Sequence, residues 1–173
     1  GVSLTAVSGS TSVSVNKICF DSRLVGAEDV FIAIRGTLTD GHRYIEKAIS
    51  LGAKAIVCEE MPDTIVDGIT YVEVDSGNKA LAIMASNYYD NPSKNLKLVG
   101  ITGTNGKTTV SSLLYQLFKK AGFKVGLIST IKIMVDDKTY ETSHTTPDAL
   151  TINEHLHLMN IAGVEYCFME VSS

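Results

Sequence analysis

The first half of the chain alternates short apolar runs with stretches whose apolar residues recur every three or four positions. Apolar runs bounded by turn-forming residues predict buried strands at 29–34, 55–58 and 70–74. The helical spacing between and after them predicts helices at 44–51 and 76–89. This alternation of strand and helix is typical of a small α/β unit.

The second half begins after a cluster of turn-forming residues at 90–95, which predicts a domain boundary between residues 94 and 95. A strand at 98–101, a glycine-rich loop, a helix and a strand at 125–128 then follow in the order of a βαβ unit, whose strands should be parallel. The other predicted elements are a hairpin at 132–142, a helix capped by Asp148 and a strand at 166–170.

Composition and charge exclude some classes of function. The chain has 173 residues, 45% of them hydrophobic and 20% charged, as in an ordinary globular protein. A net charge of -4 without a basic stripe argues against a general nucleic-acid binder. With no apolar run long enough to span a bilayer and no signal peptide, we expect a cytoplasmic protein without membrane association.

The three cysteines lie far apart in apolar segments, which favours buried free thiols. Since the sequence ends directly after a predicted strand, we expect the natural chain to continue past Ser173.

The strongest chemical signal is the glycine-rich run between the predicted strand at 98–101 and the next helix. A strand, a glycine loop and a helix N-terminus together let main-chain N–H groups surround a phosphate. Lys107 would reach the β- and γ-phosphates of a nucleotide, and the Thr108 hydroxyl would bind Mg²⁺. The run is a shortened P-loop, because Ile101 stands where the full motif has its first glycine; the alternative is a glycine turn that merely caps a helix. The candidate nucleotide-binding residues are Gly103, Thr104, Asn105, Gly106, Lys107, Thr108 and Thr109.

Three further positions carry candidate chemistry. Glu170 stands at the carboxyl end of a predicted strand, where open α/β sheets place ligands, and a carboxylate there is costly to desolvate unless a cation meets it. We interpret it as a second Mg²⁺ ligand, against the alternative of a glutamate that has simply reached the surface. For His144, in a stretch rich in hydroxyl groups, ligand contact and plain solvation of a loop both remain open. Ligand contact and an ordinary turn are equally open for Asp21-Ser22-Arg23.

In combination, several motifs resemble those of the Mur ligases, and the resemblance covers nearly the whole chain from about Lys17. It is strongest to the branch of the family that adds the third residue of the peptidoglycan peptide. The loop alone would also suit the branch that adds D-alanyl-D-alanine, or folylpolyglutamate synthase. The motifs are the loop at 103–109, Asp21-Ser22-Arg23 with the run at 29–33, Asp40-Gly41-His42-Arg43-Tyr44, Thr145-Thr146-Pro147 and the run at 169–173.

The resemblance implies an ATP-dependent amide ligase of peptidoglycan precursor synthesis, with ATP and Mg²⁺ as cofactors. A substrate carboxylate would attack the γ-phosphate to give an acyl phosphate, from which an incoming amine would displace phosphate. The implied partners are UDP-N-acetylmuramoyl-L-alanyl-D-glutamate (the UDP-N-acetylmuramoyl-dipeptide) and an amino acid, with diaminopimelate favoured over lysine. Such ligases carry a further half of the ATPase domain and a C-terminal domain, so we expect the 173-residue chain alone to lack turnover.

The resemblance also implies which ligand each part of the chain binds. Residues 1–94 would form a small UDP-sugar-binding α/β domain, and residues 95–173 the first part of a P-loop ATPase domain with a mostly parallel sheet. Lys107 would be the catalytic residue that stabilises charge on the transferring phosphoryl group, and Thr108 and Glu170 would hold Mg²⁺. The implied contacts to uridine diphosphate are Phe20, Ser22, Thr37, Leu38 and Thr39, and those to the muramoyl peptide are His144, Thr145, Thr146 and Ser172.

Two other interpretations compete with a ligase. The chain could be a complete small P-loop protein that acts as a nucleotide switch or a small-molecule kinase. It could also be a module that recognises a UDP-sugar without turnover.

Overall fold

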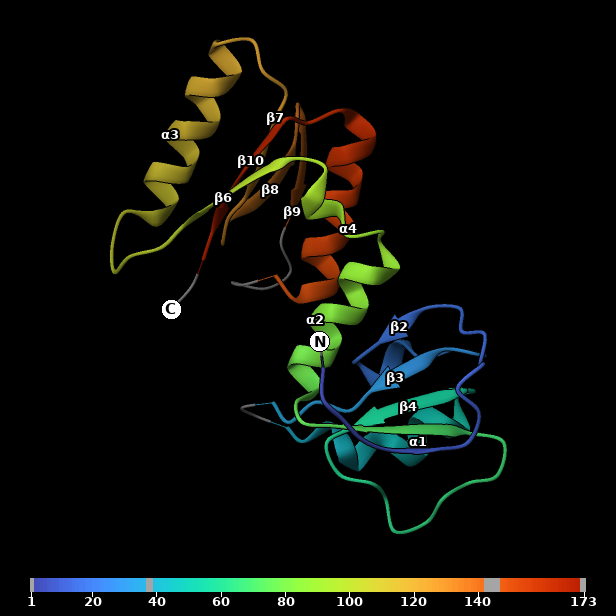
Figure 1. The fold of residues 1–173 in the computed structure, drawn as a ribbon. Coiled ribbons are helices and arrows are strands. Elements are labelled where there is room, and N and C mark those ends of the chain that lie inside the picture. The colour runs from blue at the N-terminus through green and yellow to red at the C-terminus, as the bar shows by residue number, and fades with distance from the viewer. Residues whose placement is uncertain (1, 37–38, 142–146, 172–173) are drawn as a thin grey trace. The chain divides into compact units, whose positions relative to one another are not determined.

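A computed structural model describes residues 2–36, 39–141 and 147–171 and divides the chain into two compact units, Gly1–Ala85 and Ser86–Ser173 (Figure 1). The division falls inside helix α2 (Gly77–Tyr88), and the turn at residues 90–95 belongs to the second unit. None of the described helices is long and apolar enough to cross a membrane.

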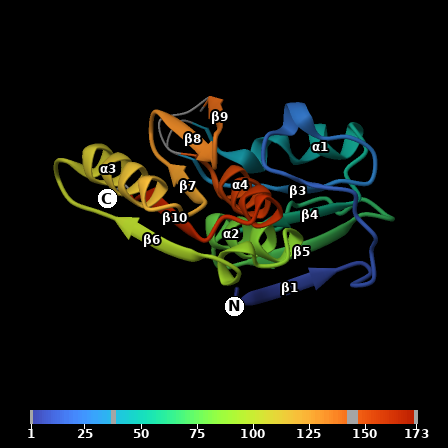
Figure 2. The same ribbon diagram turned by 90° about the horizontal axis from the view of Figure 1, so that it is seen from above.

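The first unit is built on a five-stranded sheet in the order β1-β5-β4-β3-β2. Strands β2 to β5 are parallel to one another, and β1 pairs antiparallel with β5 at the edge (Figure 2). Parallel pairing brings the carboxyl ends of β2, β3 and β4 to one edge of the sheet, which is where this unit places its candidate ligand residues. The strands are β1 (Leu4–Ser8), β2 (Ile18–Cys19), β3 (Val30–Ile32), β4 (Ala55–Cys58) and β5 (Thr70–Val74).

The alternation of side chains along these strands divides the core of the first unit in two. Phe31, Ile56 and Tyr71 point to one face, where Ala48 of helix α1 (Ile45–Ser50) packs against them. On the other face Val30, Val57 and Val72 line an apolar cavity of about 350 Å³ together with Ala80 and Met84 of α2. The sheet is therefore apolar on both faces, as parallel sheets are.

The second unit has a five-stranded sheet in the order β6-β10-β7-β8-β9. The strands β6, β10 and β7 are parallel, and β10, the last in sequence, lies between the other two. The predicted hairpin forms β8 and β9, which continue the sheet antiparallel through a turn at Asp136, whose φ is 51°. The bounds are β6 (Lys97–Ile101), β7 (Val125–Ile128), β8 (Lys132–Val135), β9 (Lys138–Glu141) and β10 (Tyr166–Glu170).

Two helices cover opposite faces of this second sheet (Figure 1). Helix α3 (Lys107–Lys120) packs Tyr115 against Leu127 and Phe168. Helix α4 (Ala149–Ala162) packs Leu156 and Met159 against the other face. The predicted α/β class with mostly parallel sheets is thus confirmed in both units.

Asp148 and Gly163 set the two ends of helix α4, and Gly126 affects how the helix packs on the sheet. The Asp148 carboxylate accepts a hydrogen bond from the Thr151 amide at 2.9 Å and caps the N-terminus, as predicted. Gly163, with a φ of 72°, ends the helix in the left-handed region. A Cβ at Gly126 would lie 2.4 Å from the Met159 sulfur, so a larger residue there would force the Met159 side chain to shift.

Candidate functional site

The glycine-rich run forms the connection between β6 and α3 in the second unit. Gly103 and Gly106 adopt φ values of 143° and 81°, which side chains with a Cβ rarely adopt, and α3 begins directly after Gly106. The first bond of the helix runs from the Val110 amide to the Gly106 carbonyl at 2.9 Å. The amides of residues 107–109 precede it and have no acceptor within the helix, so they are free to bind an anion at its N-terminus.

The side chain of Lys107 lies across this loop. Its ammonium donates a hydrogen bond to the Gly103 carbonyl at 2.6 Å. This contact keeps the positive charge at the mouth of the loop, beside the free amides of the first helical turn. A phosphate held by those amides would therefore find a cation within reach.

Glu170 ends β10, and its backbone pairs in register with Ile101, the last residue of β6 before the loop. Its Oε2 accepts a hydrogen bond from the Thr130 amide at 2.8 Å. Its Oε1 is buried and has no hydrogen-bond partner within the described part of the chain. Burial raises the pKa of the Glu170 carboxyl group, but hydrogen bonding with Thr108 and Thr130 and the charge of Lys107 outweigh it, so the pKa lies below the ordinary value. The structure thus brings Thr108, Lys107 and Glu170 close together, with Glu170 ionised at neutral pH. Their roles in binding Mg²⁺ and phosphate stay predictions.

A hard cation fits these groups. A buried carboxylate oxygen without a donor, beside a threonine hydroxyl, is the kind of oxygen ligand that Mg²⁺ prefers. The described residues contain no group of three or more His, Cys, Asp or Glu side chains that could hold a metal alone. An ion at Glu170 would therefore complete its coordination with phosphate oxygens and water, as Mg²⁺ on a nucleotide does.

In the first unit, Phe20 and Ser22 follow the carboxyl end of β2. Asp21 caps the short 3₁₀ helix η1 (Ser22–Leu24) by accepting a hydrogen bond from the Arg23 amide at 2.9 Å. The Arg23 guanidinium also pairs with the Asp21 carboxylate at 2.6 Å and lowers the pKa of that carboxyl group. The motif therefore forms a capped turn, in which Ser22 is buried while Phe20 is exposed.

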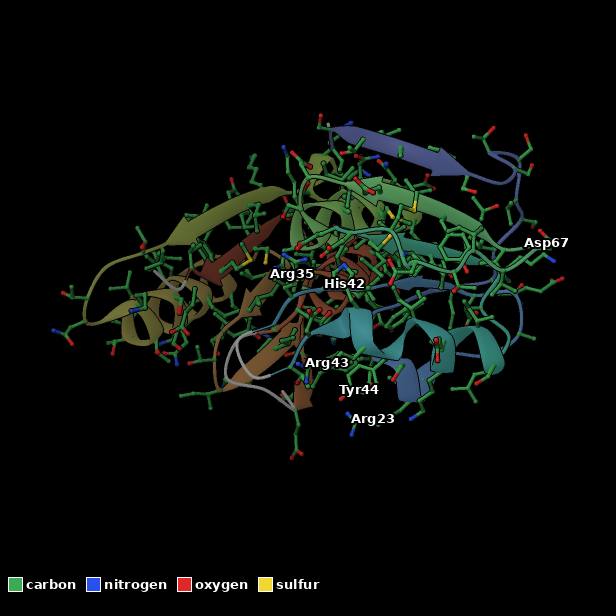
Figure 3. All side chains as sticks on the ribbon, turned by 90° about the horizontal axis from the view of Figure 1, so that it is seen from below. Arg23, Arg35, His42, Arg43, Tyr44 and Asp67 are labelled. Atoms are coloured by element: carbon green, nitrogen blue, oxygen red, sulfur yellow. The ribbon has the colours of Figure 1, made fainter. Side chains whose placement is uncertain are left out.

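A hairpin-like loop follows β3 at the same edge of the sheet. Arg35 and Asp40 form an isolated antiparallel bridge, and the Gly36 amide donates to the Thr39 carbonyl at 3.0 Å. Thr39 is exposed on this loop. Figure 3 shows Arg35 and His42 where the loop meets the sheet. The loop thus places Thr39 at the carboxyl edge that also carries Phe20 and Ser22.

Six of the predicted substrate contacts fall outside the described residues, so their predicted roles stay predictions. Among the rest, Phe20, Ser22 and Thr39 belong to the first unit, and the glycine loop with Glu170 belongs to the second. The six are Thr37, Leu38, His144, Thr145, Thr146 and Ser172.

Sequence reasoning missed Thr130 and His42 as parts of these sites. Thr130 follows the carboxyl end of β7, the neighbour of β10, so the edge rule that selected Glu170 could also have found it. His42 was named only as part of a motif. The spacing Asp40-x-His42 is nevertheless typical of an Asx turn, in which an aspartate side chain accepts a hydrogen bond from the backbone amide two residues on.

Two family models match the chain and together cover most of it. The model of the Mur ligase family, catalytic domain, matches residues 14–89, and that of the Mur ligase middle domain matches residues 101–173. The glycine loop lies in the second match, and the Asp21-Ser22-Arg23 turn in the first.

Curated and solved proteins agree with these matches. The UDP-N-acetylmuramoyl-L-alanyl-D-glutamate–2,6-diaminopimelate ligase of Cytophaga hutchinsonii is 52% identical in an alignment 173 positions long, which covers 99% of this chain and 36% of that protein. A solved structure of a ligase with the same name has a TM-score of 0.72 at 24% identity and covers 91% of this chain and 32% of its own, which shows the fold. The crystal structure of the ligase MurF from Thermotoga maritima in complex with ADP has a TM-score of 0.55 at 25% identity and covers 90% and 32%. The chain thus spans about a third of the length of the proteins that it matches.

Proposed function

Because this chain belongs to the Mur ligase family, we propose that it contributes the nucleotide loop and the uridine-diphosphate site of an ATP-dependent ligase that adds diaminopimelate to UDP-N-acetylmuramoyl-L-alanyl-D-glutamate. The observation that carries the proposal is the grouping of Lys107, Thr108 and the partly unpaired Glu170 carboxylate around the glycine loop. Membership of this family argues against an unrelated small P-loop switch or kinase. Since the chain spans about a third of its relatives, the ligation reaction is proposed for the whole protein.

In the proposed reaction the D-glutamyl carboxylate attacks the γ-phosphorus of ATP and ADP leaves, which gives an acyl phosphate. The amine of diaminopimelate then attacks the acyl carbon, phosphate leaves, and the nitrogen loses a proton. Charge builds up on the phosphoryl oxygens during the first step. Lys107 and the amides at the start of α3 would stabilise that charge, since they are already held at the loop before the reaction begins.

Thr108 and Glu170 would hold Mg²⁺ in this site. When bound there, the ion would supply positive charge that offsets part of the negative charge of the phosphates. Glu170 suits this role because its carboxylate is ionised, and Thr130 fixes one of its oxygens while the other stays unpaired. Thr130 would thus orient the ligand that binds the ion.

The nucleotide-sugar end would bind at the carboxyl edge of the first sheet. Phe20 offers an exposed aromatic face, Ser22 a hydroxyl group and Thr39 an exposed polar side chain on the loop after β3. We assign Thr37 and Leu38 to the same ligand, and His144, Thr145, Thr146 and Ser172 to the muramoyl peptide. The proposed division is residues 1–94 for the UDP-sugar and residues 95–173 for ATP.

Isothermal titration of the 173-residue chain tests the proposal. We expect binding of UDP and of UDP-N-acetylmuramoyl-L-alanyl-D-glutamate, and separate binding of ADP that requires Mg²⁺. Cytidine diphosphate, and ADP in the presence of a chelator, serve as controls. A folded chain, judged by circular dichroism, that binds neither uridine nucleotide would refute the assignment of the first unit.

A further inference from the structure

We propose that His42 is a positioning residue for the uridine-diphosphate site, because its ring joins the ligand-bearing loop after β3 to the end of β4. The described residues of this loop, 35, 36 and 39–41, are called here the site loop. This inference rests on the proposed function, which places Thr39 of the site loop against the ligand.

The two ring nitrogens of His42 have different partners, and these fix its tautomer. Nε2 accepts a hydrogen bond from the Glu59 amide at 2.9 Å, so it carries no proton. Nδ1 therefore carries the ring proton, and this N–H donates a hydrogen bond to the Asp40 carboxylate at 2.7 Å. The neutral imidazole thus connects the loop residue next to Thr39 with the first residue after β4.

The connection continues from Glu59 to helix α2. The Glu59 carboxylate accepts a hydrogen bond from the Gly77 amide in the first turn of α2 at 2.7 Å. Arg35, at the start of the site loop, lies 3.7 Å from the same carboxylate and 2.5 Å from that of Glu60. Both ends of the site loop are thereby tied to β4 and α2, one through His42 and the other through Arg35.

The backbone leaves little room for another arrangement at the end of the loop. Gly41 donates a hydrogen bond to the Ile34 carbonyl at 2.8 Å, and a Cβ at Gly41 would lie only 2.7 Å from the Ile34 nitrogen. The His42 side chain is only 14% exposed, so its bonds are shielded from competing water. A loop ordered before binding loses less conformational freedom when the ligand arrives, which makes binding tighter.

Three substitutions separate the two bonds of the bridge. His42→Ala removes both bonds. In His42→Gln the side-chain oxygen can still accept from the Glu59 amide, and in His42→Asn the side-chain NH₂ group can still donate to Asp40. Thr70→Val is the matched control, because it also removes one side-chain hydrogen bond in the first unit, that from Thr70 to the Ser10 carbonyl at 2.9 Å, at the amino end of β5.

Two measurements test the proposal, one of them without any ligand. Amide hydrogen exchange of Gly36 and Gly41 reports the order of the site loop, and the Ala33 amide, bonded to the Val57 carbonyl at 2.8 Å, is the internal reference. Titration with UDP reports affinity, corrected for the folded fraction of each variant. For His42→Ala we expect faster exchange of Gly36 and Gly41 relative to Ala33 and about tenfold weaker binding of UDP. His42→Gln and His42→Asn should fall between wild type and His42→Ala, and Thr70→Val should match wild type in both measurements.

The outcomes distinguish this inference from the proposed function. Unchanged loop exchange and unchanged corrected affinity in His42→Ala would show a purely structural role and overturn the inference. Equal loss in Thr70→Val would overturn it as well. If the wild-type chain binds no UDP while His42→Ala still loosens Gly36 and Gly41, the anchoring by His42 stands and the proposed ligand is wrong.

Discussion

The Thr130 amide donates to Oε2 of Glu170 at 2.8 Å and joins the ends of two neighbouring parallel strands beside the glycine loop. This bond uses one carboxylate oxygen and leaves Oε1 without a partner in the described chain. The two strand ends meet only because β10 enters the sheet between β6 and β7. The strand order therefore creates the pairing of an orienting amide with a candidate metal ligand.

From this arrangement we predict that Glu170→Gln weakens Mg²⁺-dependent binding of ADP by about tenfold or more, since a charged ligand contributes more than a neutral amide. The glutamine oxygen can still accept from Thr130, so the fold should persist. Calorimetric titration with ADP, with Mg²⁺ and with a chelator, measures the effect. Glu165→Gln, just before the start of β10, is the control for loss of one negative charge. Equal weakening in both variants would contradict a role of Glu170 in binding the ion.

The elements with strong local signals were predictable from the sequence. The apolar run at 125–128 gave β7 without change, and the Asp148 cap and the Gly163 stop gave the bounds of α4. The sequence predicted a helix after the glycine-rich loop without fixing its first residue, and α3 begins at Lys107 because Gly106, in the left-handed region, ends the loop. The helix predicted at 44–51 is α1, at Ile45–Ser50, and a 3₁₀ turn at Gly41–Tyr44 precedes it. The helical backbone starts early because the Asp40 side chain caps the N-terminus of that turn.

The contacts between distant segments could not be read from local patterns. The insertion of β10 between β6 and β7 depends on which strand edges meet in the folded chain, and periodicity carries no information on that choice. The same limit applies to His42, whose two ring partners lie 2 and 17 positions away. The positions of Glu170 and Thr130 at strand ends are local features, but their contact joins residues 40 positions apart, which no local pattern specifies.

A second prediction concerns acid stability. Hydrogen bonds from the His42 amide and then from the His42 ring hold the pKa of the Asp40 carboxyl group below its ordinary value. Between the lowered folded pKa and the ordinary unfolded pKa, the unfolded chain binds more protons. The stabilisation by Asp40 is therefore complete above the unfolded pKa of about 4 and is lost as the pH falls through the folded pKa.

Melting temperatures measured from neutral pH down to about pH 3 test this prediction. Asp40→Asn should melt below wild type at neutral pH, and the two curves should converge as the pH falls. Asp67→Asn, an exposed loop substitution in the same unit, should stay parallel to wild type throughout. A constant difference between wild type and Asp40→Asn would show that the charge of Asp40 is not involved.

A third prediction concerns the three cysteines, all of which are free and buried, as the sequence predicted. Burial raises the pKa of Cys19 and of Cys58 to about 11, with the charges of Asp29 and Glu73 as respective secondary causes, and burial alone raises that of Cys167 to about 12. The thiols therefore stay protonated at pH 8, and a protonated thiol is a poor nucleophile. We expect Ellman's reagent to react slowly with the native chain. In concentrated guanidinium, which unfolds the chain, all three thiols should react. Rapid labelling of the native chain would contradict the burial of these side chains.

The last prediction is that Lys107→Ala separates the two proposed ligands. The Lys107 ammonium lies across the glycine loop, where a bound phosphate would replace the Gly103 carbonyl as its partner. Loss of one charge-assisted hydrogen bond should weaken binding of ATP by about 10- to 100-fold. UDP should bind as in wild type, since its proposed contacts belong to the first unit.

Lys120→Ala is the matched control, because it removes the same charge from the last residue of the same helix, about 20 Å along its axis. That variant should bind ATP nearly as wild type does. Equal weakening of ATP binding in both variants would show that the effect comes from the loss of one positive charge on the chain and not from the position of Lys107. Loss of UDP binding in a folded Lys107→Ala chain would refute the assignment of the two ligands to separate units.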